Sequence, residues 1–137
     1  MATIKNVLVL CRENACRSQM AEAILNHDLG DQVRAVSAGL QPQSRISQGA
    51  LDALADAGLP TIGLSPKALE QFRGQSFDLV VTVCDIAKEL CPVFPRPTPR
   101  MHIPYPDPRG EPLAGFIRVR DEIRESLIPI VRTALEL

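Results

Sequence analysis

Apolar residues occur along the chain in two patterns, which predict different elements. Short continuous runs of apolar and β-branched residues are typical of buried strands. Runs of this kind predict strands at Ile4–Leu10, Val33–Ala38, Phe77–Val83 and Met101–Tyr105. The first run is apolar at nearly every position, which is typical of a strand covered on both faces, as in a parallel sheet.

The other pattern places apolar residues three or four positions apart, which predicts amphipathic helices. The predicted helices are one through Met20 and Leu25 that ends near Gly30, one over Ser44–Ala57, a short one around Ser65–Leu69, and a long C-terminal one from Phe116 onward. Pro129 lies inside the last pattern. We expect a kink or a break there, because proline cannot donate a helical hydrogen bond.

Strands that alternate with helices predict an α/β fold, in which a four-stranded parallel sheet is flanked by helices on both faces. A chain of 137 residues is expected to form it as a single domain over residues 1–137. Ligands of such sheets bind at the carboxyl ends of the strands. Cys11 and Cys84 each follow a predicted strand, so both are expected at the same edge of the sheet.

Composition narrows the classes of partner. The net charge is only −1, so no nucleic-acid partner is expected. The apolar runs are too short to cross a bilayer and the N-terminus lacks a signal-peptide pattern, which predicts a cytoplasmic protein without membrane association. In that reducing compartment, four cysteines are more often catalytic or metal-bound than paired in structural disulfides.

The segment from Cys11 to Ser18 carries the clearest chemistry. A strand leads there through a short loop into the first turn of a helix, where unpaired backbone N–H groups can converge on an anion. Cys11 is expected at the mouth of this site as a thiolate with a lowered pKa, and Arg17 as a clamp for two oxygens of a tetrahedral oxyanion. The alternative is a buried structural cysteine beside a surface arginine.

Two further cysteines, Cys84 and Cys91, precede Pro92. In a regular helix, residues seven positions apart are separated by roughly 10 Å along the axis, whereas a disulfide requires Cα atoms within about 7 Å. The pair could bridge only if the segment bends or unwinds, which indicates a redox element that changes shape. The alternatives are two inert buried thiols, or half of a zinc site shared with Cys11 and Cys16.

The spacing Cys11-x5-Arg17-Ser18, with Asn14 inside it, resembles the phosphate loop of the low-molecular-weight tyrosine phosphatase superfamily. With the later cysteine pair, the chain looks like the thioredoxin-coupled arsenate reductases of that superfamily. Supporting pieces occur in the same order along essentially the whole chain, at Ser18–Glu22, Ser37–Gly39, Asp107–Pro108 and Val119–Ile123.

This resemblance implies that the protein reduces arsenate to arsenite through three cysteines. Cys11 would attack arsenic while Asp107, as general acid with a raised pKa or poised by the bound anion, protonates the leaving oxygen. Cys84 would then attack Cys11, and Cys91 would attack Cys84 and leave a disulfide that thioredoxin reduces. Without that role, Asp107 would be an ordinary turn residue.

The resemblance also implies roles for the loop. Ser18 would hydrogen-bond the Cys11 sulfur, and Asn14 would hold the loop in shape. The residues that bind the oxyanion would be Arg12, Glu13, Asn14, Ala15, Cys16, Arg17 and Ser18. A monomer without metal or organic cofactor is expected.

Three loop residues depart from the family pattern. Arg12 and Glu13 replace the usual threonine and glycine, and Ala15 replaces serine. A carboxylate that pointed inward would oppose both the thiolate and a bound oxyanion, so we expect Glu13 to point outward with its charge offset by Arg12. The loss of glycine also removes easy access to a positive φ at this position.

Two other functions stay open. A low-molecular-weight protein tyrosine phosphatase would use Cys11, Arg17 and Asp107 to hydrolyse phosphate monoesters through a phosphocysteine. However, Asp107 and Pro108 are not followed by the tyrosine pair that those enzymes often carry. A non-catalytic oxyanion or thiol redox sensor would bind arsenate or become oxidised without turnover, if Glu13 disabled the loop.

Overall fold

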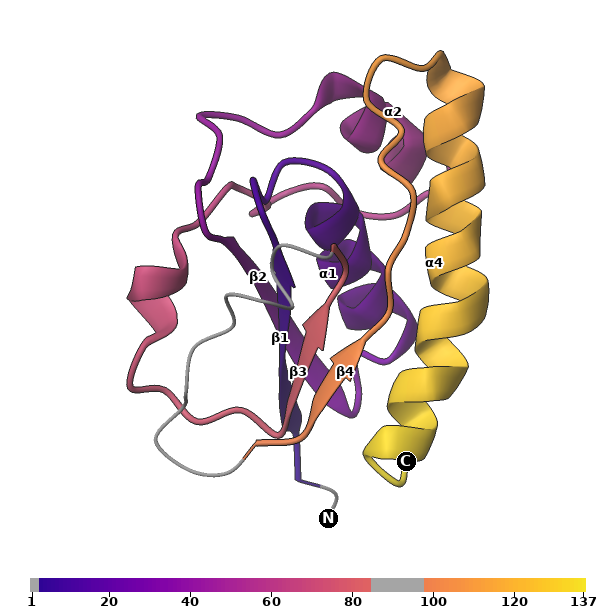
Figure 1. The fold of residues 1–137 in the computed structure, drawn as a ribbon. Helices are drawn as coiled ribbons and strands as arrows, with labels where there is room; N and C mark the ends of the chain where they lie inside the picture. The colour runs from indigo at the N-terminus through magenta and orange to yellow at the C-terminus, as the bar shows by residue number, and fades with distance from the viewer. Residues whose placement is uncertain (1–2, 85–97) are drawn as a thin grey trace.

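Four parallel strands form the sheet of this computed structural model, which describes residues 3–84 and 98–137 (Figure 1). Their order across the sheet is β2 (Val33–Gly39), β1 (Lys5–Cys11), β3 (Leu79–Thr82) and β4 (Arg100–His102). Each neighbouring pair is parallel. The predicted strands are therefore confirmed, although β3 and β4 are shorter than expected.

Strand β1 is covered on both faces, as its continuous apolar run predicts. Residues 7–10 have no exposed surface, and successive side chains of a strand point to opposite faces. In Figure 1, helices α1 (Arg17–Asp28) and α4 (Leu113–Ala134) lie to the right of the sheet, and the 3-10 helix η1 (Leu69–Phe72) lies to its left. Helix α2 (Gln48–Asp56) contacts both α1 and α4.

The three longer predicted helices are confirmed with shifted ends. Helix α2 begins at Gln48 rather than at Ser44, because residues before it are hydrogen-bonded to the loop after β1. The Ser47 N–H, for example, donates to the Ala15 carbonyl at 2.8 Å. None of the helices in the described ranges is long and apolar enough to span a membrane.

The short helix predicted around Ser65–Leu69 is wrong. The 3-10 helix begins only at Leu69, and Ala68 before it is extended and forms a bridge with Gly39 at the end of β2. The Gly39 N–H donates to the Lys67 carbonyl at 2.8 Å. These tertiary hydrogen bonds place the segment beside the sheet and override the local helix-starting signals of serine and proline.

Of the kink or break predicted at Pro129, the break is wrong, because α4 continues through this residue to Ala134. Leu127 and Val131 flank the proline and have no exposed surface. Packing of this apolar face against α1 and α2 holds the turns on either side in one helix, although proline removes one backbone donor.

The carboxyl ends of β1 and β3 meet at one edge of the sheet. Leu10 in β1 is in register with Thr82 in β3, so Cys11 and Cys84 follow at almost the same level. The prediction that these two cysteines share an edge is confirmed. Cys91 and the predicted change of shape around it lie outside the described residues.

Candidate active site

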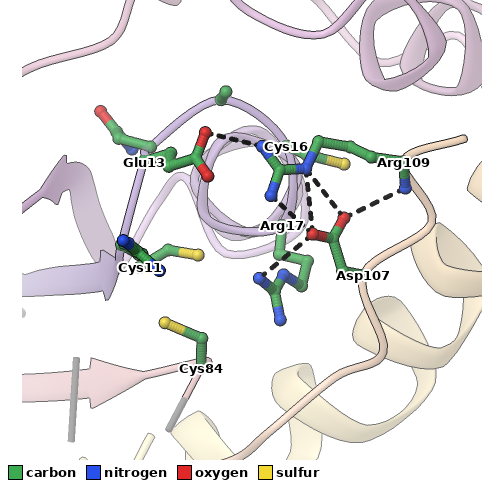
Figure 2. A pocket seen from close by; sticks show the side chains of 10 residues that line it. Cys11, Glu13, Cys16, Arg17, Cys84, Asp107 and Arg109 are labelled. Carbon is green, nitrogen blue, oxygen red and sulfur yellow. Dashed lines mark hydrogen bonds and ion pairs between the residues drawn. The ribbon is translucent and has the colours of Figure 1, made fainter. Parts of the chain in front are cut away.

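A cavity of about 260 Å³ opens at this edge of the sheet, at the ends of β1 and β3 (Figure 2). It is lined by the whole segment 11–17 and by three residues from elsewhere in the chain, Cys84, Asp107 and Arg109. Ser18 does not line it, because its side chain is buried in the first turn of α1. The fold thus gathers most predicted site residues around one small pocket.

The loop turns at Asn14, where φ is 52°. Asparagine tolerates this left-handed conformation better than most residues do, so the absence of glycine at Glu13 costs the loop little. The buried Asn14 side chain donates to the Ser18 hydroxyl at 2.8 Å and accepts from the Lys67 N–H at 2.7 Å. Within the described residues, the Ser18 hydroxyl therefore accepts from Asn14, and it makes no hydrogen bond to the Cys11 sulfur.

The loop carbonyls are bound from outside the pocket. Those of Arg12, Glu13 and Ala15 accept backbone N–H groups of the segment that follows β2, at 2.8–2.9 Å, and that of Asn14 accepts the Gln19 side chain at 2.9 Å. In a trans peptide the N–H points opposite to the C=O. The N–H groups that follow these carbonyls, those of residues 13–16, therefore turn toward the cavity, as an oxyanion site requires.

Arg17 is the first residue of α1 and extends along the cavity. One guanidinium nitrogen donates to the Tyr105 carbonyl at 3.0 Å, and the other lies 3.7 Å from an Asp107 oxygen. The side chain is mostly buried, with 15% of its surface exposed. The guanidinium is thus held in place, and its remaining N–H groups can donate to an oxyanion.

Cys11 and Cys84 are both buried thiols, and Figure 2 draws their side chains next to one another at the ends of β1 and β3. A hydrogen bond with Cys84 and burial raise the pKa of Cys11 above its ordinary value, although the Arg17 charge acts in the opposite direction. The predicted lowering of the Cys11 pKa is therefore wrong for this arrangement, because the second thiol lies closer to Cys11 than the sequence alone indicates.

Cys16 is the third buried thiol that lines the pocket. Burial and the negative charge of Asp107 raise the pKa of Cys16 to about 12, despite the opposing charges of Arg17 and Arg109. Like Cys11, this thiol therefore keeps its proton at neutral pH in this arrangement.

Glu13 meets Arg109 rather than the expected Arg12. Its carboxylate accepts from Arg109 at 2.7 Å and from the side chain of Gln43, whereas Arg12 donates to Gln41 at 3.2 Å. The Arg109 hydrogen bond is the main cause that lowers the pKa of Glu13. The charge of Arg12 also lowers the Glu13 pKa, but as the smallest of the causes, so the expected role of Arg12 belongs mainly to Arg109, a site residue that the sequence did not predict.

Asp107 is held as a carboxylate. Burial acts to raise its pKa, but hydrogen bonds from the Arg109 side chain and N–H and the charge of Arg17 outweigh it and keep the pKa below its usual value. The Arg109 guanidinium reaches both Asp107 oxygens, at 2.8–3.2 Å. A raised pKa, one of the two conditions expected for a general acid, is therefore absent from this arrangement.

A buried carboxylate supports the loop from behind. Glu22 in α1 accepts the Ser37 N–H at 2.7 Å and the Ser37 hydroxyl at 2.8 Å, and the Lys67 ammonium lies 3.3 Å away. Lys67 also binds the Asn14 side chain through its N–H.

Metal-binding side chains do not gather in the part of the chain that is described. Across residues 3–84 and 98–137, no three histidine, cysteine, aspartate or glutamate side chains are arranged so that they could hold a metal ion. The zinc alternative therefore gains no support from these residues.

Comparison with known proteins places this fold and site in a family context. A family model described as low molecular weight phosphotyrosine protein phosphatase matches residues 6–136. An arsenate reductase of Bacillus cereus is 35% identical over 127 residues, which cover 93% of this chain and 94% of that one.

Solved structures of similar proteins agree with this match. The crystal structure of an arsenate reductase from Archaeoglobus fulgidus has a TM-score of 0.77 at 32% identity and covers 91% of this chain and 98% of its own. A thioredoxin-dependent arsenate reductase of Corynebacterium glutamicum has a TM-score of 0.73 at 28% identity, over 95% of this chain and 63% of that one.

Proposed function

The chain belongs to the low molecular weight phosphotyrosine protein phosphatase family, and we propose that it reduces arsenate to arsenite with thioredoxin as the electron donor. One observation carries this proposal: a second thiol, Cys84, lies against the nucleophile Cys11 in the oxyanion pocket. Ester hydrolysis through a phosphocysteine needs one thiol, whereas donation of two electrons to arsenic needs two. Similarity to arsenate reductases over most of the chain supports the same function.

In the first step, arsenate binds in the loop between the inward N–H groups and Arg17. The Cys11 sulfur forms a bond to arsenic, the bond from arsenic to one oxygen breaks, and that oxygen leaves as water. Hydrogen arsenate brings one of the two protons in that water, and the Cys11 thiol supplies the other.

Asp107 carries the thiol proton in this scheme. It starts ionised, because Arg109 and Arg17 stabilise its charge, and with its lowered pKa it is too weak a base to take the Cys11 proton before the oxyanion binds. A negatively charged oxyanion beside the carboxylate then raises the pKa of Asp107. With its pKa raised, Asp107 can take up the proton that Cys11 loses and pass it to the leaving oxygen, so it acts first as a base and then as an acid.

In the second step, the Cys84 sulfur attacks the Cys11 sulfur. The sulfur–arsenic bond breaks and its electron pair stays on arsenic, which is reduced from As(V) to As(III) and leaves as arsenite with the proton that the Cys84 thiol loses. Cys11 and Cys84 are oxidised to a disulfide. The shared position of the two buried thiols supports this exchange.

In the third step, Cys91 attacks Cys84, which frees Cys11 and leaves a Cys84–Cys91 disulfide. The thioredoxin dithiol then reduces this disulfide and is itself oxidised. Cys91 enters the scheme through the sequence resemblance.

A coupled assay tests the whole proposal. Arsenate, thioredoxin, thioredoxin reductase and NADPH are supplied, and NADPH oxidation is followed for wild type, Cys11→Ser, Cys84→Ser and Cys91→Ser. We expect each of the three replacements to abolish multiple turnover. Cys16→Ser is the matched control, because it removes a buried thiol from the same pocket but no relay member, and it should still turn over more than once.

The same variants distinguish a phosphatase. If wild type hydrolyses p-nitrophenyl phosphate efficiently, if Cys84→Ser leaves that hydrolysis intact, and if arsenate is not reduced, then the protein is a phosphatase and not a reductase. Binding of arsenate without any turnover would indicate a sensor.

A further inference from the structure

The residues that line the pocket fall into a buried group and a more exposed group. The buried group, called the floor below, comprises Cys11, Asn14, Ala15, Cys16 and Cys84. The exposed or half-exposed group, called the rim, comprises Arg12, Glu13, Asp107 and Arg109, and the mostly buried Arg17 lies between the two groups. An oxyanion held against the floor therefore faces solvent across the rim.

One ion pair joins the two sides of the rim. Glu13 comes from the loop after β1 and Arg109 from the segment before α4, 96 positions later, and the two side chains meet at 2.7 Å. Each partner also has a second contact, Glu13 with the side chain of Gln43 and Arg109 with both oxygens of Asp107. Figure 2 shows these contacts running from Glu13 through Arg109 to Asp107.

We propose that the Glu13–Arg109 ion pair is a bar across the rim, which admits free tetrahedral oxyanions and hinders organic phosphate esters. This inference rests on the proposed function, because it assigns the substrate class of the same pocket. It gives Glu13, which departs from the family pattern, a role in specificity.

The physical reason is the direction in which an ester must extend. Three oxygens of a bound phosphoryl group face the loop N–H groups and Arg17, so the fourth substituent points away from the floor. In an ester that substituent is an organic group, which has to pass the rim where the bar lies. A free oxyanion has only an oxygen or hydroxyl there, so it binds without opening the ion pair.

Binding of two ligands tests the bar. Inorganic phosphate and phenylphosphonate, which keeps an aryl group and cannot be hydrolysed, are titrated by NMR into wild type, Glu13→Ala and Arg109→Ala. The readout is the dissociation constant for phenylphosphonate divided by that for phosphate. We expect each replacement to lower this ratio about fivefold, which corresponds to opening one partly exposed ion pair.

The two replacements change the local charge in opposite directions. Together they therefore distinguish the effect of opening the ion pair from the effect of charge on ligand binding. Loss of Glu13 removes a negative charge and should tighten both anions, whereas loss of Arg109 removes a positive charge and should weaken both. The ratio cancels this shared effect. In the double variant the ratio should fall no further than in either single variant, because the bar is already absent.

Arg12→Ala is the matched control. It also removes a positive charge from the rim, but Arg12 contacts Gln41 and not the bar, so the ratio should stay at the wild-type value. A ratio that stays at the wild-type value in both Glu13→Ala and Arg109→Ala overturns the inference. An equal fall in Arg12→Ala also overturns it.

Failure of the bar and failure of the proposed function give different results. If wild type reduces arsenate but the ratios do not change, the function stands and the bar is wrong. If the ratios fall as expected but arsenate is not reduced, the bar stands as a filter for small oxyanions and the reductase proposal is wrong.

Discussion

The floor and the rim belong to one pocket but are held by different interactions. Behind the floor, the buried Asn14 side chain makes neutral hydrogen bonds to Ser18 and Lys67, whereas the rim is joined by charges on Glu13, Asp107 and Arg109 that solvent can reach. A buried group that loses its partner cannot turn to water, but an exposed ion pair can. The floor therefore determines whether the pocket exists, and the rim determines what enters it.

The largest effect is expected at the floor, from Asn14→Ala. This change removes two buried side-chain hydrogen bonds and places alanine at a positive φ, so the free energy of unfolding should fall by about 3 kcal/mol. Urea unfolding measures it. Asn14→Gly is the control, because it relieves the backbone conformation but restores no hydrogen bond. It should recover only about 1 kcal/mol, and full recovery would contradict the role of the side chain.

The next effect is expected behind the floor, from Lys67→Met. The ammonium lies 3.3 Å from the buried carboxylate of Glu22, with 17% and 9% of the two side chains exposed. Its removal leaves that charge without its cation and should lower the free energy of unfolding by about 2 kcal/mol. Glu22→Gln in the same chain should recover part of the loss. If the double variant is as unstable as the sum of the two single variants, the ion pair is not what stabilises the loop.

The next prediction concerns the pKa of Cys11 in the variant Cys84→Ala. The hydrogen bond with Cys84 is the main cause that raises the pKa of Cys11, so its loss should move the pH dependence of Cys11 alkylation to lower pH. Mass spectrometry of the iodoacetamide-labelled Cys11 peptide over a pH series measures the midpoint. Cys16→Ala should leave that midpoint in place. A midpoint that stays or rises in Cys84→Ala would show that the two thiols do not interact as described.

The smallest effect on stability is expected at the rim, from Arg109→Ala. Its ion pairs are partly exposed, so the free energy of unfolding at neutral pH should change by less than about 1 kcal/mol. The pKa values of Glu13 and Asp107 are lowered in the folded protein. Their contribution is therefore present above the unfolded pKa values of about 4 and is lost as pH falls through the lower folded values.

Urea unfolding of wild type and Arg109→Ala at neutral and acidic pH tests the sign of this effect. The difference between the two proteins should shrink in acid, as both carboxylates become protonated. A difference that grows in acid would mean that Arg109 does not stabilise these carboxylates.

The elements that could be predicted from the sequence are those that local pattern determines. The continuous apolar run of β1 predicts a strand buried on both faces, and residues 7–10 are indeed fully buried. The position of Cys11 and Cys84 at one edge follows from parallel strand order alone. Local signals were misleading at Ser65 and Pro129, where hydrogen bonds and packing from distant segments decide the conformation.

The rim could not be predicted in the same way. Glu13 and Arg109 are 96 positions apart, and nothing in the sequence near either residue indicates the other. Their opposite charge alone does not pair them, because the chain carries 15 basic and 16 acidic residues. The predicted direction of the Cys11 pKa shift was wrong for a related reason. The shift depends on the contact with Cys84 more than on the loop that surrounds Cys11.

The central claim is that the Cys84 sulfur attacks the Cys11 sulfur once Cys11 is bonded to arsenic. A single-turnover reaction of the Cys91→Ser variant with arsenate tests it most directly, because the relay must stop at its second step. We predict one arsenite per protein and a disulfide that links the Cys11 and Cys84 peptides in mass spectrometry. Arsenite formed without that link, a Cys11–Cys16 disulfide in its place, or no arsenite at all would contradict the account.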